Sequence, residues 1–305
     1  MRLGASIAPC ILRRFRYHER MDDIIIRPTT DLFIAALYSN PKHEASLLSL
    51  LNAIMTDIGE PAIIQAMVMN PFSTLDYPDD KRIVLDVRVK DETGAFYNIE
   101  VQREPHTNFN ERMLYYWSES YGSQLQRGHD YLRLRAVRSI IITEFPIFPM
   151  LQNLHAVFEL RSKENPDVLF TKHCQIHVLR LGNFIENGFV GLEQFGLGLR
   201  RWMEFWAYGT TAEEKEMTTM LQDAPEVLAA FEEYNRFKID PAMREKVRAR
   251  QRFLDDERLK LTGAHDEGRA ERDVEIALNM KQEGCEPTFI AKMTGLSLSE
   301  IERLT

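Results

Sequence analysis

Residues 82–102 read RIVLDVRVKDETGAFYNIEVQ, and this stretch decides the fold because it has the pattern of a β-hairpin. Apolar and polar residues alternate along both arms, which is typical of strands with one buried face. Between the arms, Glu92-Thr93-Gly94 suits a three-residue loop with glycine at the position of positive φ. The register that this loop sets pairs Lys90 with Phe96, Arg88 with Asn98, and Asp86 with Glu100.

The two faces of this hairpin differ in chemistry. The apolar face is expected to join the core and carries Leu85, Val87, Val89, Tyr97, Ile99 and Val101. The polar face carries Asp86, Arg88, Lys90, Asn98, Glu100 and Gln102. Two carboxylates opposed across a strand pair have Cβ atoms roughly 4.5–5.5 Å apart and repel each other.

Something must offset the repulsion between Asp86 and Glu100, and a divalent cation is the natural candidate. Mg²⁺ is usually held by one or two carboxylates together with waters and substrate phosphates. The alternative is an ordinary amphipathic hairpin at the edge of a sheet, with its polar face in water.

Composition narrows the class of protein. The chain has 305 residues, 44% of them hydrophobic and 28% charged, which is ordinary for a globular protein with a full core. The net charge of −8 argues against a surface coated in positive charge, although nucleic-acid binding needs only a local basic strip. The three cysteines, Cys10, Cys174 and Cys285, predict neither a disulfide framework nor a zinc site.

The same sequence carries no sign of export or of a membrane span. The N-terminal stretch lacks a small-residue cleavage site, and no apolar run approaches the roughly 20 residues that cross a bilayer. We therefore expect a cytoplasmic protein with no membrane partner, consistent with its sparse cysteines.

The elements around the hairpin predict an α/β fold with a mixed sheet. Helices are expected from residue 31 to the break at Pro41 and over 42–55, followed by a strand over 63–69. After the hairpin we expect a helix over 109–126 and strands over 137–143, 155–160 and 176–181, the last two at the edge of the sheet. The helical spacing of Tyr115, Tyr116, Trp117 and Tyr121 favours packing in the core and at interfaces over platforms on which bases stack.

The chain is expected to divide into four parts. Residues 1–23 form a basic N-terminal tail without fixed structure, 24–240 the α/β domain, 241–272 a charged helical linker, and 273–305 a small module similar to a helix-turn-helix. The second helix of that module would offer Ser299, Glu300, Glu302 and Arg303, which suits a DNA major groove poorly. We therefore favour a dimerisation or docking module over a module that recognises a DNA sequence.

Several motifs together resemble the PD-(D/E)XK nuclease superfamily. Within it the chain is similar to the recombination-promoting nucleases (Rpn), also described as PD-(D/E)XK nuclease family transposases. The resemblance covers about residues 27–190. Its motifs are Pro28-Thr29-Thr30-Asp31-Leu32-Phe33, Leu85-Asp86-Val87, Tyr97-Asn98-Ile99-Glu100-Val101-Gln102, the run from Tyr115 to Tyr131, and Phe145-Pro146-Ile147-Phe148.

The resemblance implies a restriction-endonuclease-like core, with a mixed central sheet flanked by helices and a helical C-terminal extension. It implies a metal-dependent DNA endonuclease associated with recombination or mobile elements. Asp86 and Glu100 would bind Mg²⁺ or Mn²⁺, and Gln102 would position the attacking water. Asp31 matches an acidic residue that would complete the metal shell, and the alternative for it is a plain helix N-cap.

One position departs from the superfamily pattern, because Gln102 stands where lysine is usual. A lysine can stabilise negative charge in the transition state, whereas glutamine can only hydrogen-bond. This departure supports a second interpretation: a catalytically inactive nuclease-fold protein that acts as a DNA- or protein-binding module.

Contacts to nucleic acid are expected near the end of the aromatic helix. Arg127, Arg133 and Arg135 form a local basic cluster that could follow a phosphate backbone, and Gln124 on the helix could face the same ligand. Otherwise these arginines are solvated and Gln124 is a polar residue on an amphipathic helix. The C-terminal helices are candidates for a homodimer interface.

Overall fold

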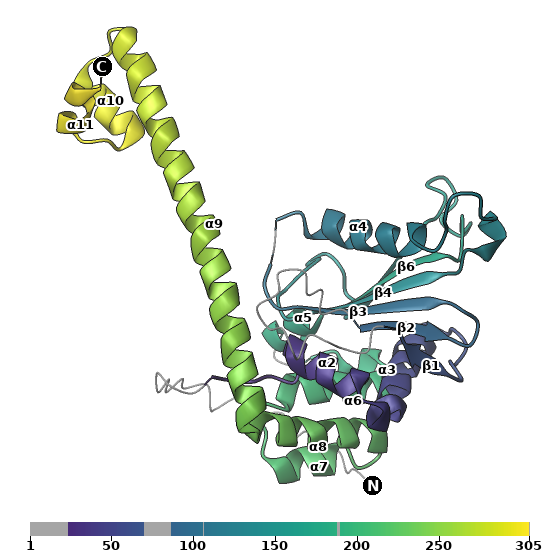
Figure 1. Ribbon diagram of the computed structural model, residues 1–305. Helices are drawn as coiled ribbons and strands as arrows, with labels where there is room; N and C mark the ends of the chain where they lie inside the picture. The colour runs from purple at the N-terminus through teal and green to yellow at the C-terminus, as the bar shows by residue number, and fades with distance from the viewer. Residues whose placement is uncertain (1–23, 70–86, 106, 188–189, 305) are drawn as a thin grey trace. The chain divides into compact units, whose positions relative to one another are not determined.

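The computed structural model describes residues 24–69, 87–105, 107–187 and 190–304, and a six-stranded mixed sheet lies at the centre of the fold (Figure 1). The strand order is β1-β2-β3-β4-β6-β5. The strands are β1 Ala66–Val68, β2 Val87–Asp91, β3 Phe96–Gln102, β4 Val137–Thr143, β5 His155–Glu159 and β6 Cys174–Leu179. Strands β3, β4 and β6 run parallel, and the other neighbours are antiparallel. The predicted α/β fold with a mixed sheet is confirmed.

The hairpin β2–β3 has the predicted register. Lys90 pairs with Phe96 and Arg88 with Asn98. In the turn, Gly94 has a φ of 87°, a backbone conformation that glycine adopts without a steric penalty. The third predicted pair, Asp86 with Glu100, cannot be placed because Asp86 lies outside the described residues.

The carboxylate of Asp91 organises this turn. Its Oδ1 accepts hydrogen bonds from the backbone amides of Thr93 and Ala95, at 2.8 and 2.9 Å. Its Oδ2 accepts one from the hydroxyl of Tyr97 at 2.9 Å. The turn is thus fixed by a buried polar side chain as well as by glycine.

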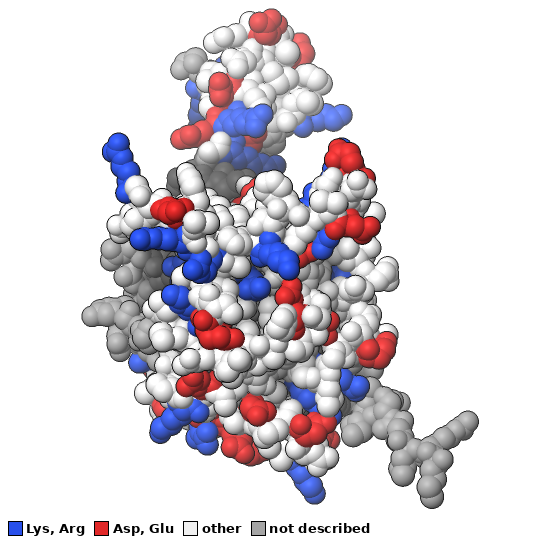
Figure 2. Space-filling view, turned by 90° about the vertical axis from the view of Figure 1, so that its right-hand side faces the viewer, with Lys and Arg blue, Asp and Glu red and all other residues white. Residues whose placement is uncertain are grey.

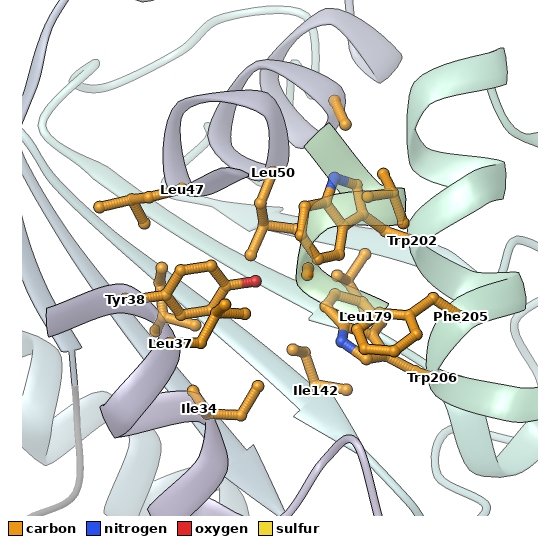
Figure 3. Close-up of a cluster of buried hydrophobic side chains, with 14 of the residues drawn as sticks. Ile34, Leu37, Tyr38, Leu47, Leu50, Ile142, Leu179, Trp202, Phe205 and Trp206 are labelled. Atoms are coloured by element: carbon orange, nitrogen blue, oxygen red, sulfur yellow. The ribbon is translucent and has the colours of Figure 1, made fainter. Parts of the chain in front are cut away.

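The apolar face of the sheet carries the main core. Helices α2 Asp31–Ser39, α3 Glu44–Asp57, α5 Leu181–Glu186 and α6 Leu197–Tyr208 lie on this side, and α8 Pro225–Ile239 packs against α2, α3 and α6 (Figure 1). In Figure 3, Leu37 and Tyr38 of α2 and Trp202 and Phe205 of α6 surround Ile142 and Leu179 of the sheet. Ile99 and Val87 are fully buried in the same core, as their alternation predicts.

The opposite face of the sheet is covered by α4, which runs from Phe109 to Gly122 (Figure 1). Its buried residues are Phe109, Met113 and Ser120. The hydroxyl of Ser120 accepts hydrogen bonds from Asn98 Nδ2 at 2.7 Å and from Arg88 Nη2 at 3.2 Å. The hairpin is therefore inside the sheet with its polar face covered, and the interpretation as a solvated edge hairpin is wrong.

Phe109 is the buried aromatic residue of α4, so the expectation of core packing is wrong for Tyr115 and only partly met by Tyr116, Trp117 and Tyr121. Tyr115 is 62% exposed, and Tyr116, Trp117 and Tyr121 are only partly buried. Trp117 stacks on Tyr121 with ring centroids 5.2 Å apart, and its Nε1 donates to the carbonyl of Val137 at 3.0 Å. These rings attach the outer side of α4 to the start of β4 instead of filling the core.

Helix α5 was not expected from the sequence, and it lies directly against the loop after β4. A Cβ atom added to Gly182 would come 2.3 Å from the carbonyl carbon of Phe145 and 2.6 Å from that of Glu144. Only glycine permits this approach of the two backbones. The remaining short elements are η1 Pro41–His43, η2 Tyr131–Arg133, η3 Leu192–Gln194 and α7 Glu214–Met220.

The chain divides into two compact units, residues 1–247 and 248–305. Helix α9 spans 42 residues, Pro241–Gln282, and its last turns pack with α10 Pro287–Thr294 and α11 Leu298–Arg303 around Ala277, Ile290 and Ile301. The ammonium group of Lys281 donates to three carbonyl oxygens at the end of α11, those of Ile301, Glu302 and Leu304. Within the described parts of the chain, no helix combines the length and the apolar character that crossing a membrane requires.

Candidate active site

The candidate site lies at the carboxyl end of β3. Strands β3 and β4 are parallel and stop together, with Gln102 beside Thr143 in the register. Glu100 and Gln102 project to the same face as Asn98, because alternate residues of a strand share a face. Since Asn98 bonds to Ser120 of α4, this is the face that α4 covers. Glu100 and Gln102 therefore share one face of β3, as predicted.

Three side chains at this end form one hydrogen-bonded chain. The Nε2 of Gln102 donates to Oε1 of Glu100 at 2.5 Å. The Oε1 of the same amide accepts a hydrogen bond from Nη2 of Arg112, near the start of α4. Gln102, the middle member of this carboxylate–amide–guanidinium chain, is only 8% exposed, whereas Glu100 and Arg112 are partly buried.

Glu144 forms a second polar cluster immediately after β4. Its side chain, 6% exposed, accepts a hydrogen bond from Nη1 of Arg27 at 2.8 Å and another from the hydroxyl of Thr29. Arg103 Nε lies 3.5 Å from the same carboxylate. The backbone amide of Glu144 donates to the carbonyl of Gln102 at 2.9 Å. Glu144 therefore ties the segment that enters α2 to the end of β3.

Asp31 begins α2, two residues after Thr29, and so lies at the same end of the sheet as Glu144. The N-cap position of α2 belongs to Thr30, so Asp31 is a first-turn residue and not the N-cap. Its Oδ1 accepts a hydrogen bond from the backbone amide of Leu32 at 2.7 Å. A carboxylate in this position also favours the helix through the dipole of its first turn.

The donor set can be compared with what a divalent ion needs. Glu100 supplies a carboxylate oxygen, the ligand type that Mg²⁺ prefers, whereas the oxygen of Gln102 is directed to Arg112. Within the described ranges, no three His, Cys, Asp or Glu residues gather closely enough to hold a metal ion. Asp86, the second predicted ligand, is outside those ranges. The residues present thus fit one half of the predicted metal site.

The predicted nucleic-acid contacts lie at the other end of the sheet, where β4 begins. Gln124 is beyond the last residue of α4, so its predicted place on the helix is wrong. Its Nε2 donates to the carbonyl of Arg135 at 3.0 Å, and its Oε1 accepts from the amide of Arg135 at 2.8 Å. The guanidinium of Arg135 in turn donates to the carbonyls of Leu132 and Leu134.

Arg127 and Arg133 are exposed in the loop between α4 and β4. Figure 2 looks at the side of the molecule that is on the right in Figure 1, the side of the α4–β4 loop. On this face lysines and arginines lie among acidic residues instead of forming one uninterrupted basic field. The structure thus separates this arginine cluster from Glu100 and Gln102.

Sequence reasoning missed Arg112 and Glu144. Glu144 had a usable signal, since it directly follows the carboxyl end of a strongly apolar strand parallel to β3. Arg112 had none, because its contact joins a strand end to a helix ten residues later and follows no periodic pattern.

A mixed sheet with helices on both faces, and a Glu-x-Gln pair ending a central strand, define an α/β protein with a PD-(D/E)XK nuclease core. The family model described as PD-(D/E)XK nuclease family transposase matches residues 28–264. The chain belongs to this family, as the sequence motifs predicted. No curated protein and no solved structure gives a significant match to it.

Proposed function

We propose that this protein is a metal-dependent endonuclease that hydrolyses DNA phosphodiester bonds, in recombination or in the biology of mobile elements. The observation that carries the proposal is the carboxylate of Glu100, held at the end of β3 by the amide of Gln102. Membership of a nuclease family supports the reaction class. The ion, the DNA substrate and the biological setting are part of the proposal.

Asp86 and Glu100 would hold Mg²⁺ or Mn²⁺, as expected from the sequence. Such an ion lowers the pKa of a bound water and neutralises charge that develops on a phosphate. The amide nitrogen of Gln102 has two hydrogens, and one of them donates to Glu100. We assign the second hydrogen to the attacking water, which it would orient toward the phosphorus atom.

Asp31 would assist from the start of α2. The contact between Thr29 and Glu144 holds that helix start at the end of the sheet where β3 stops. From there its carboxylate would complete the set of ligands around the ion. This role belongs to the proposal and makes Asp31 a secondary residue compared with Asp86 and Glu100.

Two further surfaces belong to the proposal. Arg127, Arg133 and Arg135 would contact the phosphate backbone away from the scissile bond, with Gln124 holding the backbone of Arg135. In the C-terminal unit, α10 and α11 expose the apolar side chains of Phe289, Met293 and Leu298. We propose that these C-terminal helices form a homodimer.

The alternative function is a nuclease-fold protein that binds DNA or another protein without cleaving. Gln102 favours it, because its side chain brings no positive charge to the site. The two functions make opposite statements about metal-dependent turnover, so one assay separates them.

The assay is nicking of a supercoiled plasmid with Mg²⁺, with Mn²⁺ and with EDTA. We expect cleavage with either ion, none with EDTA, and loss of cleavage in Asp86→Asn and in Glu100→Gln. The double variant, purified in parallel, controls for contaminating nucleases. An inactive wild-type protein that still retards DNA in gels would replace the endonuclease with the binding function.

A further inference from the structure

The carboxylate, amide and guanidinium that meet at the end of β3 indicate how this site is charged. Residue 102 is a neutral glutamine, so strand β3 itself brings no positive charge to the side of Glu100. We propose that Arg112 of α4 supplies this charge from the neighbouring helix, as a positioning residue that acts through Gln102. This inference rests on the proposed endonuclease function.

The first argument is the orientation of the amide. Glu100 offers only acceptors and therefore needs a donor, whereas the guanidinium of Arg112 offers only donors and needs an acceptor. Glutamine presents its NH₂ group to Glu100 and its carbonyl oxygen to Arg112, so it satisfies both partners. The orientation of the amide is therefore fixed by the two charges beside it.

The second argument is what other residues would do at position 102. A lysine would place its ammonium group against the guanidinium of Arg112, and a glutamate would place its carboxylate against Glu100. Like charges at such short range repel strongly, and the repulsion is greater at a position as buried as that of Gln102. The glutamine on β3 and the arginine on α4 thus depend on each other.

The third argument is the setting of Arg112 itself. Its guanidinium carbon lies 6.0 Å from the centre of the Tyr116 ring, one turn further along α4. Its Nε–H is buried and has no acceptor among the described residues. A buried donor left without a partner is uncommon and costs free energy. The guanidinium of Arg112 is therefore not held here by its own hydrogen bonds alone.

The consequence concerns the negative charge that a phosphodiester reaction develops. A fixed cation behind Gln102 holds its amide in the orientation in which the NH₂ group faces Glu100 and the site. Removing the guanidinium leaves both residues in place but frees the amide to rotate. We therefore expect an effect on kcat with little change in KM for DNA.

A double-mutant cycle tests this pairing with Gln102→Lys, Arg112→Gln and the double variant. We expect each single variant to lower kcat by about tenfold, equal to ~1.4 kcal/mol, while the double variant recovers most of the activity. Thermal unfolding in EDTA provides a readout that does not need activity. In Gln102→Lys, the new ammonium group beside the guanidinium of Arg112 should lower the unfolding temperature. Adding Arg112→Gln should restore most of this loss.

The matched control is Arg88→Gln, which removes another guanidinium contact between the sheet and α4, the one from Arg88 to Ser120. It should change thermal stability but leave kcat near the wild-type value. An equal loss of kcat in this control and in Arg112→Gln would reduce Arg112 to a packing residue and overturn the inference.

The remaining outcomes separate this inference from the proposed function. If the wild-type protein cleaves DNA and the variants combine additively in kcat, the inference fails and the endonuclease stands. If the wild-type protein does not cleave DNA and the unfolding temperatures combine non-additively, the endonuclease fails and the pairing of Gln102 with Arg112 stands. Additive unfolding temperatures in an inactive protein would remove both.

Discussion

The two ends of the central sheet hold their polar residues in different ways. Where β3 stops, polar side chains bond to one another around the buried amide of Gln102, which links Glu100 to Arg112. Where β4 begins, Gln124 and Arg135 bond to backbone groups, and the neighbouring arginines are exposed. The first arrangement fixes charges relative to one another, whereas the second shapes a loop. A cluster of arginines in the sequence is therefore weaker evidence for a reactive site than a few side chains that are joined by hydrogen bonds.

The largest effect should come from breaking the end of β3. We expect Glu100→Gln to lower metal-dependent cleavage by roughly a thousandfold, because an amide cannot replace a carboxylate as a metal ligand. The triple variant Arg127→Gln, Arg133→Gln, Arg135→Gln should retain kcat and lose DNA affinity instead. Binding measured against salt concentration should have a slope smaller by about 0.9 for each phosphate contact removed.

The comparison between the two ends depends on this contrast. A triple variant that lost kcat as severely as Glu100→Gln would mean that the two ends of the sheet act on the same phosphate. An unchanged salt slope would leave Arg127, Arg133 and Arg135 as solvated surface residues.

The hairpin shows what the sequence could predict. Alternating residues and Gly94 determine both the faces and the register of β2 and β3, since side chains repeat every two residues and the loop length sets the pairing. The same reasoning failed for α4, because helical spacing shows which residues share a face and not which face meets the sheet. In α4 the buried pair is Phe109 and Met113, while Tyr115 faces water.

The charged contacts of the site could not be predicted from the sequence, for a different reason. The bond from Arg112 to Gln102 depends on how α4 is laid across the sheet. That placement comes from tertiary packing, as do the contacts of Glu144 with Arg27 and Thr29. Such contacts cannot be inferred from residue spacing. The sequence therefore predicted the strand that bears Glu100 and Gln102, but not the contacts made by Arg112 and Glu144.

The next effect concerns the loop that follows β4 at the same end as Glu144. The guanidinium of Arg180, 2% exposed, donates to the carbonyls of Ile147, Phe148, Leu151 and Asn153, at 2.8 to 2.9 Å. Burial also lowers the pKa of this arginine. We expect Arg180→Met to reduce the free energy of unfolding by about 3 kcal/mol, because four backbone carbonyls lose a buried, charged donor.

Urea unfolding measures this loss, and Arg161→Met is the matched control. Arg161 pairs with Glu159 at 2.6 Å in a well-exposed position, so its removal should cost less than about 1 kcal/mol. Similar losses in the two variants would show that the loop after β4 does not depend on Arg180.

A smaller effect is expected from pH, at His155 of β5 and His177 of β6. His177 is fully buried, and its Nδ1 lies 3.1 Å from Nε2 of His155, whose Nδ1 is 2.7 Å from the carboxylate of Asp57. Burial, and then the positive charges of His155 and Arg138, hold the pKa of His177 well below its usual 6.5.

As the pH falls, the unfolded chain therefore binds a proton at His177 at a higher pH than the folded protein does. The stability that this neutral histidine contributes is complete above about pH 6.5 and is lost as the pH falls toward the lowered pKa. Unfolding measured from pH 8 to pH 5 should show this loss, and His177→Gln should flatten it. The exposed His129 provides the control, since His129→Gln should leave the slope unchanged.

The smallest effect is expected at the start of β4, where hydrogen bonds shape a loop and should not contribute to catalysis. Gln124→Ala removes two hydrogen bonds to the backbone of Arg135, and we expect a loss of about 1 kcal/mol in the free energy of unfolding with no change in kcat. Gln126 is exposed in the same loop and bonds to His129 through its backbone amide and carbonyl, so Gln126→Ala should cost almost nothing. Because Gln124 and Gln102 are both glutamines with two engaged amide atoms, Gln102→Ala gives the complementary comparison. A loss of kcat at Gln102 alone would locate the chemistry where one side chain links a carboxylate to a guanidinium, and an equal loss at Gln124 would move it to the other end of the sheet.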